Sequence, residues 1–293
     1  MRSEKEMLEL ILSTAREDDR IRAVILNGSR ANPEVVGDIF QDFDIVYIVT
    51  DIVSFKETPA WIECFGELMI LQLPDDMGDY PSSRDRYAYL MQFADGNRID
   101  LTLYSVARID ELARDSLSVL LLDKDNIIDP FPPSNESDYL AKPPTQKSFS
   151  DCCNEFWWVS AYVAKGLWRE EITYAKAVFE QFLRTELMKM LTWYVGVETH
   201  FSINLGKFGR RLQQHLDPTL WELLVSTYSD ADSDHTWDAL DAACRLFRAT
   251  ACSVAEHFGF AYSRDEDENI TAHLNHVREL PRDAQEMYRE VRD

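Results

Sequence analysis

The chain of 293 residues is long enough for two domains, or for one large one, each with a buried core. Apolar residues make up 45% of it and aromatic residues 12%, a composition that fits a globular protein and excludes a disordered one. The 52 acidic residues outnumber the 30 basic ones, and the formal charge of -22 repels nucleic-acid phosphates and anionic lipids. We therefore expect no nucleic-acid and no membrane partner. The acidic excess suits a cationic ligand and a highly soluble surface equally well.

The cysteines and the apolar segments indicate a cytoplasmic protein. The five cysteines are odd in number, lack CxxC metal spacing and include the vicinal pair Cys152 and Cys153, so we expect free thiols in a reducing compartment. The N-terminal stretch MRSEKEMLELILSTARED is charged and amphipathic and has no apolar signal-peptide core. Apolar runs elsewhere are broken well short of a bilayer span, for example by Lys165.

Up to about residue 130, helical and strand patterns alternate along the chain. Apolar side chains recur at helical spacing near the N-terminus, and period-two runs bounded by turn residues follow. The pattern predicts a mixed β-sheet flanked by helices, an α+β fold. The expected elements are a helix over 4–16, strands at 21–27, 43–49 and 66–74, a hairpin over 87–106 that turns at Asp95-Gly96, a helix near 108–115 and a strand at 118–123.

A proline-rich segment separates this region from a helical one. Five of the 11 prolines fall within DPFPPSNESDYLAKPP, which is typical of a linker. We therefore expect one domain over 1–130, a linker over 131–145 and an α-helical bundle domain over 146–293. The acidic tail from Arg264 is expected to be peripheral. The expected helices of the second domain are 148–166, 173–195, 217–228 and 235–258.

Carboxylates lie at the head of an otherwise apolar strand. Asp42 and Asp44 are two residues apart, so their side chains share one face of the strand, with Cα atoms about 6–7 Å apart. Paired carboxylates of this kind raise each other's pKa or bind a cation, and their hard oxygen atoms suit Mg²⁺. Asp100 is likewise isolated in an apolar strand, and it would complete a two-metal site for phosphoryl or nucleotidyl transfer if the two strands are neighbours. Gly28 and Ser29 offer close backbone approach and a hydroxyl for a phosphate.

The arrangement of Gly-Ser, twelve residues, DFD and a later lone Asp in a strand resembles that of the polymerase-β-type nucleotidyltransferase superfamily. Within it, the chain is similar to the aminoglycoside 6-adenylyltransferases, the bacterial streptomycin-modifying family. The stretches that carry the resemblance run along nearly the whole chain: MRSEKEM, GSRAN, FQDFDIVYIVTD, FADGNRIDLTL, VLLLDKD, SDCCNEFWWVSAYVAKGL and GKFGRRL.

The resemblance implies transfer of AMP from ATP to a hydroxyl of streptomycin, and thereby antibiotic resistance, with Mg²⁺ as cofactor, expected as two ions. It implies that Asp42 and Asp44 hold Mg²⁺, and that Asp100 is either the third metal ligand or the base for the sugar hydroxyl. The residues implied for nucleotide binding are Gly28, Ser29, Arg30 and, from the helical domain, Lys207. Arg30 could equally be a structural ion-pair residue, and Lys207 a surface charge.

A cationic acceptor needs carboxylates and aromatic faces, because streptomycin carries guanidinium groups. Asp151 and Glu155 are four residues apart on one helix face, and Trp158 follows. Spacing and resemblance together make these three the candidate substrate-binding residues. The alternative is that both acids belong to a solvated helix face.

Two other functions stay open from the sequence. The same fold could adenylylate a hydroxyl of another small molecule or of a protein, or it could be a nucleotide-binding module without catalysis. The second alternative could lose Asp100, which is present here. A monomer and a dimer are equally compatible with the sequence.

Overall fold

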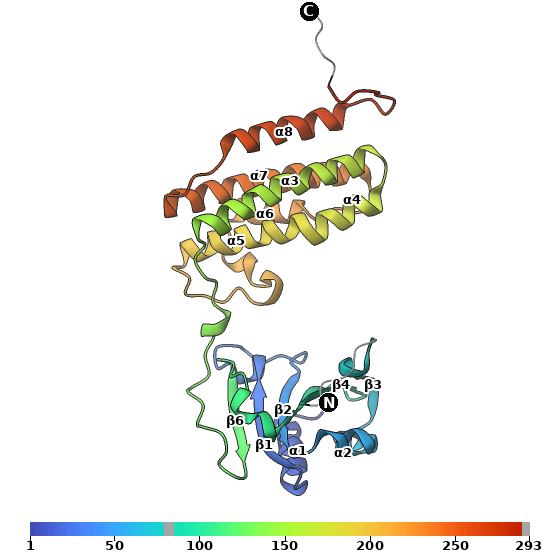
Figure 1. The fold of residues 1–293 in the computed structure, drawn as a ribbon, viewed down its shortest axis with the longest axis vertical. Coiled ribbons are helices and arrows are strands. Elements are labelled where there is room, and N and C mark those ends of the chain that lie inside the picture. The colour runs from blue at the N-terminus through green and yellow to red at the C-terminus, as the bar shows by residue number, and fades with distance from the viewer. Residues whose placement is uncertain (79–84, 289–293) are drawn as a thin grey trace, which may run out of the picture. The chain divides into compact units, whose positions relative to one another are not determined.

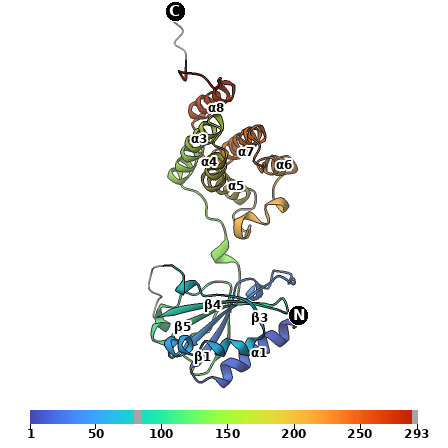
Figure 2. The same cartoon turned by 90° about the vertical axis from the view of Figure 1, so that its right-hand side faces the viewer.

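The computed structural model describes residues 1–78 and 85–288 (Figure 1). The chain divides into two compact units, Met1–Asp138 and Tyr139–Asp293. The first unit contains a β-sheet with flanking helices, and the second is helical (Figures 1 and 2). The predicted α+β fold is therefore confirmed.

A six-stranded sheet forms the centre of the first unit, in the order β3-β4-β5-β2-β1-β6. All neighbouring strands are antiparallel except β2 and β5, which pair in parallel and make the sheet mixed. The strands are β1 (Ile21–Asn27), β2 (Phe43–Val49), β3 (Leu68–Gln72), β4 (Arg86–Phe93), β5 (Arg98–Ser105) and β6 (Ser118–Asp123).

Helices cover one face of this sheet. Helix α1 (Glu4–Glu17) begins at a capping box, in which the Ser3 hydroxyl accepts a hydrogen bond from the Glu6 amide and the Glu6 carboxylate accepts one from the Ser3 amide. Its apolar stripe packs on the core with α2 (Ile52–Glu57) and the 3₁₀ helix Pro59–Phe65. Buried Phe43, Ile45 and Tyr47 point toward this layer, so the alternating residues of β2 point to the other face.

The prediction of an α-helix near 108–115 is wrong. The structure has only a 3₁₀ segment, Val106–Glu111, and Arg108 inside it departs from helical backbone angles with φ −116° and ψ 19°. Six residues are too few to stabilise an α-helix without tertiary packing, and none of the six is buried. The segment instead borders a small cluster on the second face of the sheet around Ile25, Ile48 and Ile128.

The second unit packs helices around one core. Phe156 of α3 (Gln146–Trp168) stacks on Phe247 of α7 (Ser233–Phe258) with ring centroids 3.8 Å apart. The single helix expected over 173–195 is α4 followed by a π-helical turn, Phe179–Leu183, and then α5. The α-helices are α3 (Gln146–Trp168), α4 (Ile172–Val178), α5 (Arg184–Glu198), α6 (Pro218–Ser226), α7 (Ser233–Phe258) and α8 (Arg264–Glu279). Among the described residues, no helix combines the length and apolar character needed to cross a bilayer.

The acidic tail is part of this bundle, contrary to the expectation of a peripheral segment. Asp267 of α8 is 3% exposed and accepts hydrogen bonds from Arg248 of α7, at 2.7 and 2.5 Å, and from the Tyr262 hydroxyl, at 2.7 Å. Leu274 and Val277 join the same hydrophobic core. A buried carboxylate is stable only when it is paired, so the contact between Asp267 and Arg248 holds α8 against α7.

Candidate active site

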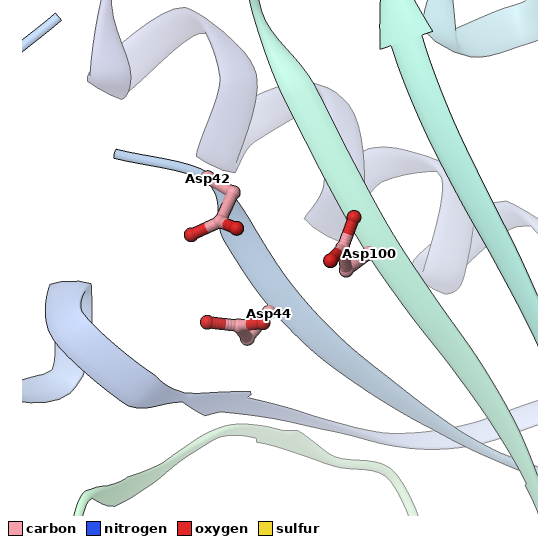
Figure 3. Close-up of side chains that lie close together, drawn as sticks. All are labelled: Asp42, Asp44 and Asp100. Carbon is pink, nitrogen blue, oxygen red and sulfur yellow. The ribbon is translucent and has the colours of Figure 1, made fainter. Parts of the chain in front are cut away.

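Three carboxylates converge on the face of the sheet that points away from α1. The parallel pairing of β2 and β5 sets Asp44 directly beside Asp100, and Asp42 lies two residues before Asp44. One carboxylate oxygen from each residue lies within 4.8 Å of the others (Figure 3). All three side chains are half-buried, so they are accessible to a ligand.

The Gly-Ser turn after β1 lies against this triad. Gly28 has φ +73°, and a Cβ atom at this position would lie 2.3 Å from Oδ2 of Asp44, so only glycine fits here. The Gly28 amide already donates to the Leu117 carbonyl at 3.0 Å. Ser29 is half-exposed, and within the described part of the chain its hydroxyl has no hydrogen-bond partner. Ser29 is therefore the better placed of the two to donate to a phosphate.

Arg30 contacts the backbone that carries Asp42. Its side chain is only 7% exposed, and it donates to the carbonyls of Asp42 at 2.9 Å and Gln41 at 2.7 Å. The guanidinium also stacks on the ring of Phe43, 3.9 Å from its centroid. These contacts favour a role in positioning Asp42. The phosphate contact implied for Arg30 stays a prediction.

Arg98 contacts the triad, and no motif of the sequence points to it. It lies two residues before Asp100 on β5 and donates to both of its carboxylate oxygens, from Nε and Nη2, each at 2.7 Å. Nε is also 3.9 Å from Oδ2 of Asp42. The signal was present in the sequence, because the two-residue spacing that joins Asp42 to Asp44 also places Arg98 and Asp100 on one face.

The electrostatics of the site are concentrated on Asp44. Burial, reinforced by the neighbouring charges of Asp42 and Asp100, raises the pKa of Asp44 to about 7, while Arg98 acts in the opposite direction. A carboxyl group with such a pKa releases its proton near neutral pH, or earlier when a cation binds. The cluster is therefore suited to cation binding and to proton exchange.

A cavity of about 220 Å³ lies on the same face of the sheet. Asn27, Val46 and Thr102 line it, and Val46 and Thr102 lie two residues beyond Asp44 and Asp100 on their strands. Arg86, Arg114 and Phe131 are among the other residues that line it. The triad thus borders a recess within the first unit that has both polar and apolar surfaces.

The remaining candidates belong to the helical unit. Asp151, Glu155 and Trp158 are exposed on α3, where Asp151 pairs with Lys147 at 2.5 Å and the Trp158 indole donates to a tyrosine hydroxyl at 2.9 Å. Lys207 is exposed in a 3₁₀ turn, Lys207–Gly209, with its ammonium 5.5 Å from the Phe208 ring centroid. Their roles toward substrates stay predictions.

Comparisons with known proteins identify the family of this chain. The model of the streptomycin adenylyltransferase family matches residues 1–277. The chain belongs to that family. It is 43% identical to an aminoglycoside 6-adenylyltransferase of Campylobacter jejuni, over 89% of this chain and 91% of the relative. The corresponding protein of Bacillus subtilis (strain 168) is 40% identical, over 94% and 98%.

A solved structure is also similar. The crystal structure of an aminoglycoside 6-adenyltransferase from Bacillus subtilis is 37% identical, with 95% of this chain and 99% of that chain covered and a TM-score of 0.47. Family membership makes the chain an enzyme of the nucleotidyltransferase class. The family and the enzyme class expected from the sequence are therefore confirmed.

Proposed function

We propose that this enzyme transfers AMP from ATP to an aminoglycoside hydroxyl, the 6-hydroxyl of streptomycin, and so confers resistance. The observation that supports this most is the convergence of Asp42, Asp44 and Asp100 in a chain of the streptomycin adenylyltransferase family. The relatives named as aminoglycoside 6-adenylyltransferases, 38% to 43% identical, support the acceptor class.

The triad fits Mg²⁺. Its donors are carboxylate oxygens, the hard ligands that Mg²⁺ prefers, and they come from residues held by paired strands. Asp42 and Asp44 would hold the cation, with Asp100 as a third ligand. When bound, the cation supplies positive charge that stabilises the developing charge on the phosphoryl oxygens and lowers the pKa of a bound hydroxyl.

The proposed reaction is a direct in-line displacement at the α-phosphorus. The acceptor oxygen forms a bond to phosphorus, the bond to the bridging oxygen of the β-phosphate breaks, and pyrophosphate leaves. The hydroxyl proton passes to Asp100 if that residue is the base, or to solvent if it is only a metal ligand. Ser29 would donate to a phosphate oxygen, and Lys207 would add a positive charge.

The acceptor is proposed to bind through acids and an aromatic ring of α3. Glu155 and Asp151 are exposed, and the Trp158 side chain is 60% exposed, so all three are open to solvent on their helix. Guanidinium groups pair with carboxylates in bidentate geometry and stack on indole rings. The match between this surface and the cationic groups of streptomycin supports the choice of acceptor.

A pyrophosphate-release assay tests the proposal. With ATP and Mg²⁺, streptomycin should support release and kanamycin should not. Asp42→Asn and Asp44→Asn should each lower turnover by about a thousandfold. Each variant removes a carboxylate ligand of the cation whose charge would stabilise the transition state. Asp241→Asn, an exposed acid of α7, is the matched control and should keep full turnover.

The outcomes separate the alternatives. Substantial turnover in either triad variant, with a normal circular dichroism spectrum, would mean that the cation binds elsewhere. If no aminoglycoside of a broad panel supports pyrophosphate release, the proposed acceptor class is wrong. The assignment to the nucleotidyltransferase class would still hold.

A further inference from the structure

Arg98 is paired with a carboxylate of the triad. Its guanidinium donates to both oxygens of Asp100 and approaches Asp42, while the Asp44 carboxylate receives no hydrogen bond from residues 1–78 and 85–288. Among the residues that the structure describes, it is the one cation paired with a carboxylate of the triad. It therefore neutralises part of the charge of three acids whose carboxylate oxygens lie within 4.8 Å of one another.

This pairing and cation binding oppose each other. A divalent ion that all three acids hold would use an oxygen of Asp100, and Arg98 already donates to both of these oxygens. A guanidinium next to a bound dication also adds repulsion between like charges. The Arg98 side chain is 46% exposed, against 20% for Asp100, so Arg98 can turn into solvent while Asp100 stays in place.

We propose that Arg98 exchanges partners: it pairs with Asp100 in the empty site and turns to a phosphate of ATP when the triad holds a divalent cation. The planar guanidinium fork matches a phosphate as well as it matches a carboxylate, and ATP arrives with its own negative charge. Arg98 is then a positioning residue in the empty enzyme and a nucleotide-binding residue in the loaded one. This inference rests on the proposed function and extends it to the order of events at the same site.

The exchange predicts two effects of opposite sign for Arg98→Ala. Without nucleotide, the variant should bind Mn²⁺ about three- to tenfold more tightly than the wild-type enzyme, because a competitor for Asp100 is gone. With saturating Mg²⁺, it should bind the non-reactive analogue α,β-methylene-ATP about tenfold more weakly, because a phosphate partner is gone. Calorimetric titration measures both affinities without any turnover.

Two further variants sharpen the test. Arg98→Lys keeps the charge and loses the fork, so it should weaken analogue binding while changing Mn²⁺ affinity less than Arg98→Ala does. It also preserves the test if Arg98→Ala fails to fold. Arg16→Ala removes the arginine of an exposed ion pair with Glu9 on α1, at 3.0 Å, on the helix that covers the other face of the sheet. That control should leave both affinities unchanged.

The inference is overturned if Arg98→Ala weakens the binding of both Mn²⁺ and the ATP analogue, or changes neither affinity. A purely structural ion pair would give one of these two results. Asp44→Asn tells this failure apart from failure of the proposed function. If Asp44→Asn leaves Mn²⁺ affinity unchanged, the triad is not the cation site. If Asp44→Asn abolishes Mn²⁺ binding and the two Arg98→Ala effects share one sign, only the exchange is wrong.

Discussion

Asp44 is crowded on three sides, by Asp42, by Asp100 and by the backbone of Gly28. Burial and the two neighbouring acids raise its pKa to about 7, far above that of an ordinary aspartate. Between the usual carboxyl pKa, about 4, and this value, the folded state holds a proton that the unfolded chain has released. Raising the pH through that window therefore lowers the free energy of unfolding. The site gives up some stability to keep its acids together.

This titration should appear in cation binding. Because a cation must displace the proton of Asp44, the affinity of the nucleotide-free enzyme for Mn²⁺ should rise about tenfold between about pH 6 and about pH 8. Asp44→Asn should remove this rise, and Asp42→Asn should move its midpoint to lower pH because one repelling charge is lost. A pH-independent affinity in the wild-type enzyme would contradict the assignment of Asp44.

The sequence predicted the three acids because Asp42 directly precedes an apolar strand and Asp44 and Asp100 interrupt one, a pattern visible in one dimension. It did not predict the partners of the two arginines nearby. Arg30 lies in a turn whose course no periodicity describes, and its burial against Phe43 depends on how residues 32–42 fold back. Strand alternation predicts that Arg98 shares a face with Asp100. An exposed arginine in a hairpin is common, however, so this placement suggests a role only once Asp100 is assigned to the site.

At the scale of elements, the parallel pairing of β2 and β5 is what joins the acids. In that pair Asp44 lies opposite Asp100, and the two strands between them in the sequence, β3 and β4, lie on the outer side of β5. The patterns predicted the strands and the hairpin, yet the neighbour relation of β2 and β5 was an assumption, because register and order are tertiary properties. The same limit explains α8, whose acidic composition concealed a buried contact between Asp267 and Arg248.

Helix α3 makes a prediction at this scale. Asp151 is already paired with Lys147, whereas Glu155 has no ion-pair partner among the described residues, so Glu155 is the freer acid for a guanidinium. Glu155→Ala should raise KM for streptomycin about tenfold and leave KM for ATP unchanged. The exposed Glu256→Ala on α7 is the matched control. Equal increases in both KM values would mean that Glu155 does not bind the acceptor.

At the scale of the whole molecule, the dominant property is the formal charge of -22. A surface of this sign attracts polycations over the Debye length, about 10 Å at 0.1 M salt, and repels polyanions such as ATP. The two proposed substrates carry charges of opposite sign. Their encounters with the enzyme should therefore respond to salt in opposite directions.

Steady-state kinetics can check this. Between about 0.02 M and about 0.3 M sodium chloride, kcat/KM for streptomycin should fall several-fold, because screening weakens the attraction. Over the same range kcat/KM for ATP should stay level or rise. A parallel fall for both substrates would point to a general effect of salt on the catalytic step and would contradict steering by the net charge.

The hydrogen-bonded ladder between β2 and β5 has an evolutionary consequence. It anchors Asp44 and Asp100 in the sheet, whereas the residues proposed to select the acceptor lie on α3, in the other compact unit. Under the proposed function, selection by a new drug can change residues of the helical unit while the sheet that carries Asp44 and Asp100 stays the same. Clinical variants with altered drug ranges should then accumulate their substitutions after residue 138.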